Sequence, residues 1–271
     1  MWFVTGASSG LGQALARRLL AGGARVIVSA RDPAAIAPLA AAYPEQALAL
    51  RLDIRDEAMV ADAVAAGLAR FGTIDVLVNN AAFGLFGAVE EVTEAQARAV
   101  FDTNFFGTLR MIRHVLPVMR ARAAGRIINI SSAVARFGVG GLGLYAASKC
   151  AIEGLSTALV GELAPLGIHV MVAEPGALAT AFGANMAHAD SLPAYGFIRE
   201  RWAQWLDQAL LGDLDRAAAA IVEAGLMSAP PATLVLGQDA LQLVRGKLEA
   251  DLAECLRWTP LTLSITPGAQ A

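Results

Sequence analysis

The most informative side chains in this sequence are a tyrosine and a lysine four positions apart in the stretch YAASK. Only three tyrosines and two lysines occur in 271 residues, yet Tyr145 and Lys149 share this stretch. On an α-helix, positions i and i+4 lie on one face, so both side chains point the same way. A free tyrosine has a pKa of about 10, and a nearby ammonium favours its phenolate. The spacing therefore predicts an acid–base pair that works nearer to neutral pH.

Two more polar side chains fit chemistry on a carbonyl or hydroxyl group. Ser132 ends the stretch GRIINISS, thirteen residues before Tyr145, where its hydroxyl can hydrogen-bond a substrate carbonyl and the alkoxide that develops from it. Asn104, in NFFG, can bind an ordered water beside the lysine. These residues together predict proton transfer at an oxygen atom.

The elements that must position these groups alternate along the chain. Short apolar runs, typical of buried strands, occupy residues 2–5, 25–30, 47–52, 74–79, 125–131, 168–174 and 233–237. Helix-length segments lie near residues 10–22, 33–43, 56–70, 143–163, 213–228 and 239–257, and two further helical stretches together span roughly residues 93–121. This alternation predicts an α/β fold, a doubly wound parallel sheet with helices on both faces and right-handed crossovers.

A glycine-rich turn joins the first strand to the first helix. In TGASSGLG, Gly6, Gly10 and Gly12 allow a tight turn and let the backbone approach a pyrophosphate at the positive end of a helix. A turn that only packs strand on helix is the alternative. Asp53, after the third strand, can accept a hydrogen bond from an adenine amino group or cap a helix. The pair of asparagines in NNAA (79–82) fits a ligand crevice, satisfies neighbouring backbone, or does both.

The end of the second strand indicates which dinucleotide binds. In SARD, Ala30 stands where a carboxylate for the ribose hydroxyls of NAD is expected, and Arg31 follows it. A guanidinium suits a 2′-phosphate, which favours NADP(H) over NAD(H). Asp32 could serve the ribose instead if the register is shifted by two residues.

Seven motifs in this order resemble those of the short-chain dehydrogenase/reductase family. They span residues 3 to about 180 and read TGASSGLG, LDI, NNAA, NFFG, GRIINISS, YAASK and PGALAT. The resemblance implies a Rossmann-type domain, hydride transfer on a carbonyl or alcohol, and a catalytic tetrad of Asn104, Ser132, Tyr145 and Lys149, with the tyrosine as proton donor in reduction. It implies that Lys149 also holds the nicotinamide ribose.

The resemblance also implies a set of cofactor contacts. They are Gly6, Ser8, Ser9, Gly10, Leu11, Gly12, Arg31, Asp53, Ile54, Asn80, Ala81, Tyr145, Lys149, Pro175, Gly176 and Thr180. The chain is most similar to the NADP-dependent steroid- and retinol-type and carbonyl-reductase branches. It departs from the family pattern at Ala82, where a glycine is usual, and in lacking the glycine-rich close of tetrameric members.

We expect a single dinucleotide-binding and catalytic domain over residues 1–271. Segment 177–212 breaks the strand–helix alternation and is rich in aromatic side chains, which predicts a small helical substrate lid; ordinary packing is the alternative. A helical tail follows at about 239–257, and residues 265–271 (ITPGAQA) are expected to be loose. The apolar residues around the reacting centre favour an apolar ketone, aldehyde or secondary alcohol.

Composition excludes several other classes. A net charge of −3 without a long basic run argues against nucleic-acid binding, and no apolar stretch of eighteen residues predicts a membrane span. The opening residues are not typical of a signal peptide, so we expect a cytoplasmic protein. We also expect a homo-oligomer (dimer or tetramer). Two isolated cysteines and three scattered histidines predict neither a disulfide nor a metal site. A non-catalytic dinucleotide sensor and a ketoreductase for acyl-carrier-bound substrates remain alternatives.

Overall fold

The centre of the molecule is a seven-stranded parallel sheet. The computed structural model describes residues 1–266, so most of the tail that is expected to be loose lies outside the described residues. The strands run in the order β3-β2-β1-β4-β6-β7-β9. They are β1 (Trp2–Val4), β2 (Val26–Ala30), β3 (Ala47–Arg51), β4 (Val76–Asn79), β6 (Gly125–Ile130), β7 (Ile168–Pro175) and β9 (Thr233–Leu236).

Alternate strand residues build two cores, one on each face of the sheet. Trp2 and Val4 pack in one core, while Phe3 packs in the other, as the period of two along a strand requires. Because helices cover both faces, the strands are mostly apolar instead of alternating regularly between apolar and polar residues. The predicted α/β fold is confirmed.

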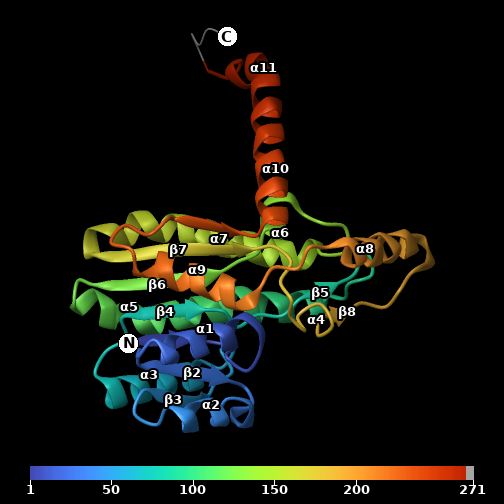
Figure 1. Cartoon of the computed structure of the whole chain (residues 1–271). Helices are drawn as coiled ribbons and strands as arrows, with labels where there is room; N and C mark the ends of the chain where they lie inside the picture. The colour runs from blue at the N-terminus through green and yellow to red at the C-terminus, as the bar shows by residue number, and fades with distance from the viewer. Residues whose placement is uncertain (267–271) are drawn as a thin grey trace.

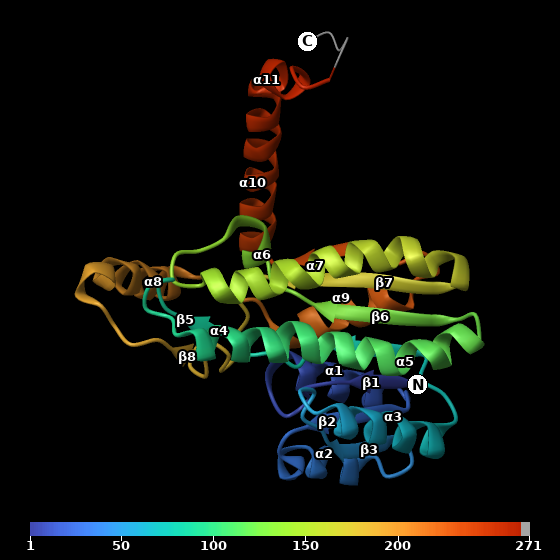
Figure 2. The same ribbon diagram turned by 180° about the vertical axis from the view of Figure 1, so that it is seen from behind.

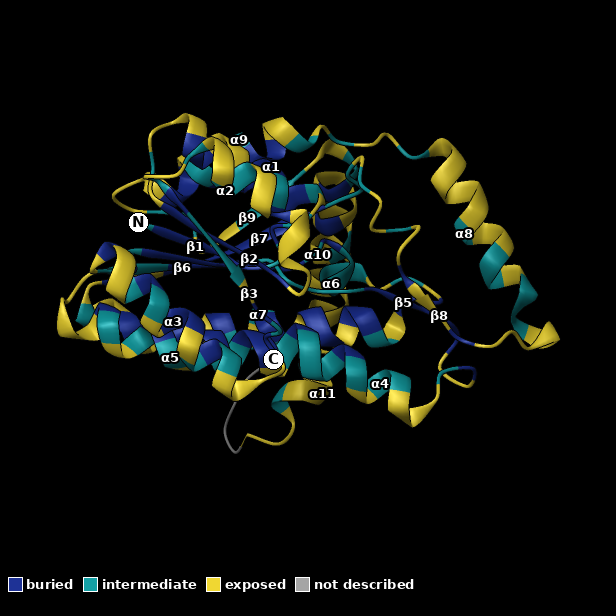
Figure 3. Cartoon of the chain, turned by 90° about the horizontal axis from the view of Figure 1, so that it is seen from below, coloured by how far each residue is buried: buried dark blue, intermediate teal, exposed yellow. Residues whose placement is uncertain are grey.

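The helices divide between the two faces (Figure 3). On one face lie α1 (Gly10–Ala21), α2 (Ala37–Ala42) and α9 (Leu214–Leu226). On the other face lie α3 (Glu57–Phe71), α5 (Thr108–Ala121) and α7 (Gly143–Leu163). The chain moves outward from β1 through β2 to β3, then returns to place β4 on the other side of β1. The carboxyl ends of β1 and β4 therefore diverge into loops at a switch point, where such sheets bind ligands.

Two α-helices precede β6, as the sequence predicts, and a π-helical turn joins them. A π-helical turn, Asp102–Gly107, separates α4 (Glu94–Phe101) from α5 and contains Asn104. π-Turns widen a helix by one residue and often mark functional positions. A capping box between Thr93 and Gln96 starts α4.

The segment 177–212 contains more regular structure than its sequence indicates. Helix α8 (Gly196–Gln208) follows a two-residue strand, β8 (Ala187–His188), which pairs in parallel with β5 (Leu85–Phe86). The sequence shows no strand here, because two residues are too few to produce a period and the pairing joins segments about a hundred positions apart. Short helices occur at Pro33–Ala35, Val134–Phe137, Ala164–Leu166 and Pro193–Tyr195.

The last helices leave the body of the molecule (Figures 1 and 2). Helix α10 (Gln238–Arg257) begins where the helical tail is expected, and α11 (Thr259–Leu263), which the sequence analysis does not predict, follows it. Within residues 1–266, no helix combines the length and the apolar character that crossing a bilayer requires.

Candidate active site

Helix α7 brings the tyrosine and the lysine together as their spacing predicts. Tyr145 and Lys149 are both buried, at 7% and 4% exposure. The Lys149 Nζ atom donates a hydrogen bond of 2.8 Å to the carbonyl oxygen of Ile130, the last residue of β6, and lies 5.8 Å from the centroid of the tyrosine ring. The strand end thus holds the ammonium beside the phenol.

Burial shifts the two groups in opposite directions. It raises the pKa of the Tyr145 phenol to about 12, and the nearby Ser132 hydroxyl opposes that shift. It lowers the pKa of Lys149 to about 8, while the charge of Glu153 acts in the other direction. The prediction that the lysine brings the pKa of the tyrosine toward neutrality is wrong for the protein groups alone, because burial disfavours the phenolate more than the Ser132 hydrogen bond favours it. Tyr145 is therefore protonated at neutral pH.

Ser132 and Asn104 reach the site by different routes. Ser132 follows β6 and its Oγ accepts a hydrogen bond of 3.4 Å from the Val134 amide. The buried Asn104 amide is engaged with protein: its Oδ1 accepts from the Phe83 N–H at 3.1 Å, and its Nδ2 donates to the Phe83 carbonyl and to Ser148 Oγ, each at 3.0 Å. This side chain thus joins the π-helical turn to the loop after β4 and to α7.

A cleft of about 840 Å³ opens at the carboxyl ends of the central strands. Most of the residues expected to act there line it: Gly6, Ser8, Ser9, Gly10, Leu11, Arg31, Asp53, Ile54, Asn80, Ala81, Ser132, Tyr145, Lys149, Pro175, Gly176 and Thr180. Gly12 and Asn104 do not. A Cβ on Gly12 would lie 2.3 Å from the Gly6 carbonyl oxygen, so this glycine serves close packing of helix on turn.

The glycine turn is shaped by its backbone. Gly6 has φ +66°, and a Cβ there would lie 2.8 Å from the Cα of Ala81; Gly10, at φ +54°, starts α1. Asn80 Nδ2 donates to the carbonyls of Thr5 and Gly6 at 3.0 Å, so this asparagine does satisfy neighbouring backbone. The result is a turn of glycines and small side chains at the N-terminus of a twelve-residue helix that faces the cleft, which fits a pyrophosphate.

Three charged residues lie where the adenosine end of a dinucleotide would bind. Asp53 accepts hydrogen bonds from the Arg55 side chain and amide, and Asp56 is the N-cap of α3, so the capping alternative for Asp53 is wrong. Asp32 accepts from the Ala34 amide in the short helix after β2. Within residues 1–266, Arg31 lines the cleft with no carboxylate at salt-bridge distance, which leaves its guanidinium available for an anion.

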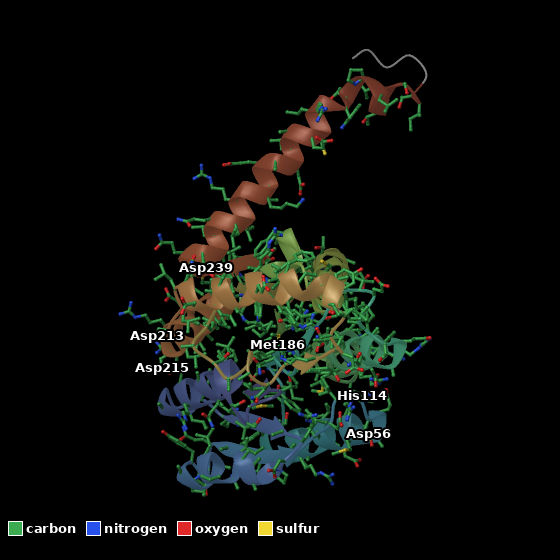
Figure 4. All side chains as sticks on the ribbon, turned by 90° about the vertical axis from the view of Figure 1, so that its right-hand side faces the viewer. Asp56, His114, Met186, Asp213, Asp215 and Asp239 are labelled. Atoms are coloured by element: carbon green, nitrogen blue, oxygen red, sulfur yellow. The ribbon has the colours of Figure 1, made fainter. Side chains whose placement is uncertain are left out.

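Apolar side chains cover the other end of the cleft. The ring of Phe182 lies 5.6 Å from that of Tyr145, and the stacked rings of Trp202 and Trp205 are 4.9 Å apart. Figure 4 places Met186 near the middle of the molecule, and it also lines the cleft. The sequence analysis does not anticipate three lining residues from the start of α10, namely Asp239, Ala240 and Leu243. No local pattern marks them, since only the tertiary fold brings α10 to this edge.

A partly buried ionic network behind the catalytic helix was also not predicted from the sequence. Arg136 pairs with Glu174 at 2.5 Å and with Glu153 at 3.1 Å, and Ser131 Oγ donates to Glu153 at 2.8 Å. Glu174 is fully buried on β7, directly before Pro175. The network therefore links α7, one turn beyond Lys149, to the strand end that borders the cleft. No group of three histidine, cysteine or acidic side chains within residues 1–266 could hold a metal ion.

Comparison with known proteins agrees with this geometry. A family model described as short chain dehydrogenase matches residues 1–191. Oxidoreductase BOA17 of Botryotinia fuckeliana (strain B05.10) is 32% identical over 269 residues, which cover 97% of this chain and 98% of that protein.

Two solved structures extend the likeness to three dimensions. A short-chain dehydrogenase from Streptomyces avermitilis is 40% identical with a TM-score of 0.91, and 96% of each chain is covered. A 3-ketoacyl-(acyl-carrier-protein) reductase from Brucella melitensis, complexed with NADH, is 29% identical with a TM-score of 0.75, covering 87% of this chain and 94% of that one.

Proposed function

The chain belongs to the short-chain dehydrogenase/reductase family, and from that premise we propose that it transfers hydride between NADP(H) and an apolar ketone, aldehyde or secondary alcohol. The observation that carries the proposal is the buried Tyr145–Lys149 pair at the base of the cleft, beside Ser132. We further propose that the chain is a cytoplasmic homo-oligomer and that residues 177–212 act as a substrate lid.

In reduction, the protein supplies a proton and holds the carbonyl. Tyr145, protonated because burial raises its pKa to about 12, donates its proton to the substrate oxygen, while Ser132 Oγ donates a hydrogen bond to the same atom. Lys149 keeps an ammonium beside the phenol through its bond to the Ile130 carbonyl and stabilises the phenolate that proton donation leaves. Asn104 fixes the π-helical turn against α7. The bound nicotinamide supplies the hydride.

The glycine turn, the start of α1 and Arg31 would hold the cofactor. Gly6, Gly10 and the first turn of α1 would bind the pyrophosphate, and Arg31 would bind the 2′-phosphate of NADP(H). Pro175, Gly176 and Thr180 would border the nicotinamide. The absence of a carboxylate at the end of β2 supports NADP(H), although the Brucella reductase is complexed with NADH.

The same relative supports a second candidate function. Because that structure is a 3-ketoacyl-(acyl-carrier-protein) reductase, reduction of a carrier-bound ketoacyl group is possible for this chain too. The two candidates differ in substrate size and charge, since a carrier protein needs a docking surface beside the cleft.

A substrate panel tests the proposal and separates the candidates. We expect kcat/KM with NADPH to be highest for bulky apolar ketones and aldehydes and lowest for sugars, phosphorylated compounds and small hydroxy acids, because Phe182, Met186 and Trp202 leave a charged group without a partner. Matched alcohols with NADP⁺ test the reverse direction. A best substrate with a phosphate or several hydroxyls would contradict the apolar site, and a strong preference for carrier-bound over free ketoacyl substrates would select the second candidate.

A further inference from the structure

Helix α10 is attached to the body only at its first two turns. Ala240 and Val244 are buried, at 1% and 5% exposure, in a small cluster with Ala133. Asp239 accepts a hydrogen bond of 3.1 Å from the Ala177 amide, and Figure 4 shows α10 leaving the body from the level of Asp239. From residue 245 to residue 266, no side chain is buried. The outer part of α10 and all of α11 thus project into solvent.

The projecting helix carries leucines along one face. Leu241, Leu248 and Leu252 are 58%, 56% and 61% exposed, and they form what is here called the leucine stripe. Their spacing of seven and four places them within about 40° of one another around a helix of 3.6 residues per turn. Cys255 lies on the same face near the end of α10, and Leu256, 64% exposed, flanks it.

A helix with this surface needs a partner. Isolated helices of this length are marginal in water, because most helical stability comes from packing an amphipathic face. Contiguous exposed leucines are also unfavourable in solvent and mark interaction sites. Nothing within residues 1–266 covers the stripe.

We propose that the leucine stripe packs antiparallel against the stripe of a second copy of this chain. The charges along α10 favour this occupant and this direction. Residues 238–248 carry Asp239, Arg245 and Lys247, a net +1, whereas residues 249–257 carry Glu249, Asp251, Glu254 and Arg257, a net −2. Antiparallel pairing places the basic half of each helix beside the acidic half of the other, and parallel pairing would place like against like.

The pairing is compatible with closed two-fold symmetry. In an antiparallel pair, the same patch of each copy contacts the other, which is the isologous arrangement of most homodimers. A membrane surface fits the same face less well, because α10 has four acidic and three basic side chains, and interfacial helices are typically basic on their polar face.

The stripe and the cleft lie on different sides of α10. Leu243, which lines the cleft, is on average about 160° around the helix from the three residues of the leucine stripe, so pairing leaves the cleft open. The assembly and the catalytic activity are therefore separable, and the test of one does not depend on the other.

The double variant Leu248→Glu/Leu252→Glu tests the surface. We expect light scattering coupled to size exclusion to show half the wild-type mass, because two added charges on each helix cannot be buried in the pair. The matched control Ala250→Glu/Ala253→Glu adds the same charge to the opposite, exposed face of α10 and should keep the wild-type mass. Circular dichroism shows whether each variant is folded.

Cross-linking tests the direction. If Leu248 of one copy packs against Leu252 of the other, position 245 of one copy faces position 255 of the other. In a Cys150→Ala background, Arg245→Cys should therefore form an intermolecular disulfide with the native Cys255 on mild oxidation, whereas the background alone should not. A Cys255–Cys255 cross-link in the background would overturn the antiparallel arrangement.

Three results would overturn the proposal as a whole. They are a monomeric wild type, an unchanged mass for the leucine variant, and an equal loss of mass for the alanine control. A monomeric wild type that co-floats with phosphatidylcholine vesicles through the same leucines would assign the stripe to a lipid surface instead.

Discussion

At the residue scale, the site keeps a phenol and an ammonium in one solvent-poor place. Burial acts against the charged form of both groups, so it raises the pKa of Tyr145 and lowers that of Lys149. A protonated tyrosine is what reduction of a carbonyl requires. Burying the lysine ammonium costs folding free energy, and the hydrogen bond to the Ile130 carbonyl holds the side chain in place despite that cost. An arginine, which stays protonated and needs more hydrogen-bond acceptors, fits this place less well.

The cost of the buried lysine makes a testable prediction about stability. Its pKa falls from 10.5 in the unfolded chain to about 8 in the folded one, so the penalty is complete below pH 8 and disappears as the pH rises toward 10.5. We expect Lys149→Met to abolish activity. Its free energy of unfolding should exceed that of the wild type by about 2 kcal/mol more at pH 7 than at pH 10. Urea titrations at both pH values check this; a difference that does not change with pH contradicts the assignment of a buried ammonium.

Arg31 carries the prediction about cofactor choice. Arg31→Ala should weaken NADPH binding about ten- to a hundredfold, the effect of losing roughly 1.5–3 kcal/mol of charged hydrogen bonding, and should leave NADH nearly unaffected. Arg25→Ala is the matched control, because Arg25 precedes β2 at the opposite end of the strand. Dissociation constants from fluorescence titration decide the matter. Equal losses for both cofactors, or a wild type that prefers NADH, would move the role to Asp32.

At the element scale, one carboxylate joins the proposed lid to the body. Glu91 is buried, and its oxygens accept hydrogen bonds from both terminal nitrogens of Arg199, at 2.8 and 3.0 Å. They also accept from the amides of Ala88 and Leu192, each at 2.8 Å. The Arg199 hydrogen bond holds the pKa of Glu91 down to about 2. Because a lowered carboxyl pKa loses its stabilising effect only as the pH falls from 4.5 toward 2, the connection persists at neutral pH.

Removing that charge should loosen α8. We expect Glu91→Gln to speed amide hydrogen exchange in residues 192–208 by about tenfold, the scale of one lost hydrogen bond, and to raise KM more than it lowers kcat. Glu90→Gln is the control, since Glu90 accepts only from the exposed Tyr195 hydroxyl. If exchange in α8 is unchanged while KM rises, residues 192–208 do not act as a lid.

At the scale of the whole molecule, the parallel sheet explains why distant motifs converge. Every strand ends at the same edge, so Gly6 after β1, Asn80 after β4, Ser132 after β6 and Pro175 at the end of β7 meet in one cleft. That convergence was predictable from sequence, because strand ends are read from short apolar runs and the crossovers follow a fixed hand. That Tyr145 and Lys149 share one face of a helix was also predictable, because positions i and i+4 lie on the same side of an α-helix.

Contacts between distant segments were not predictable. The pairing of β5 with β8, the Arg136–Glu174 pair and the cleft residues of α10 each depend on segments far apart in the chain, and none leaves a local pattern. The direction of the Tyr145 pKa shift was missed because it depends on burial, which the spacing of two residues does not reveal.

The most direct test of the account is the rate of NADPH oxidation by Tyr145→Phe with a bulky apolar ketone. The substitution removes the phenol oxygen and keeps the ring that packs on Phe182, so the fold and NADPH affinity should be nearly unchanged. The account predicts that kcat falls about 10²- to 10⁴-fold, as expected for loss of a general acid. A variant that turns over at the wild-type rate would contradict the proposed role of Tyr145. A wild type that binds NADPH but does not oxidise it in the presence of any carbonyl tested would indicate a dinucleotide sensor.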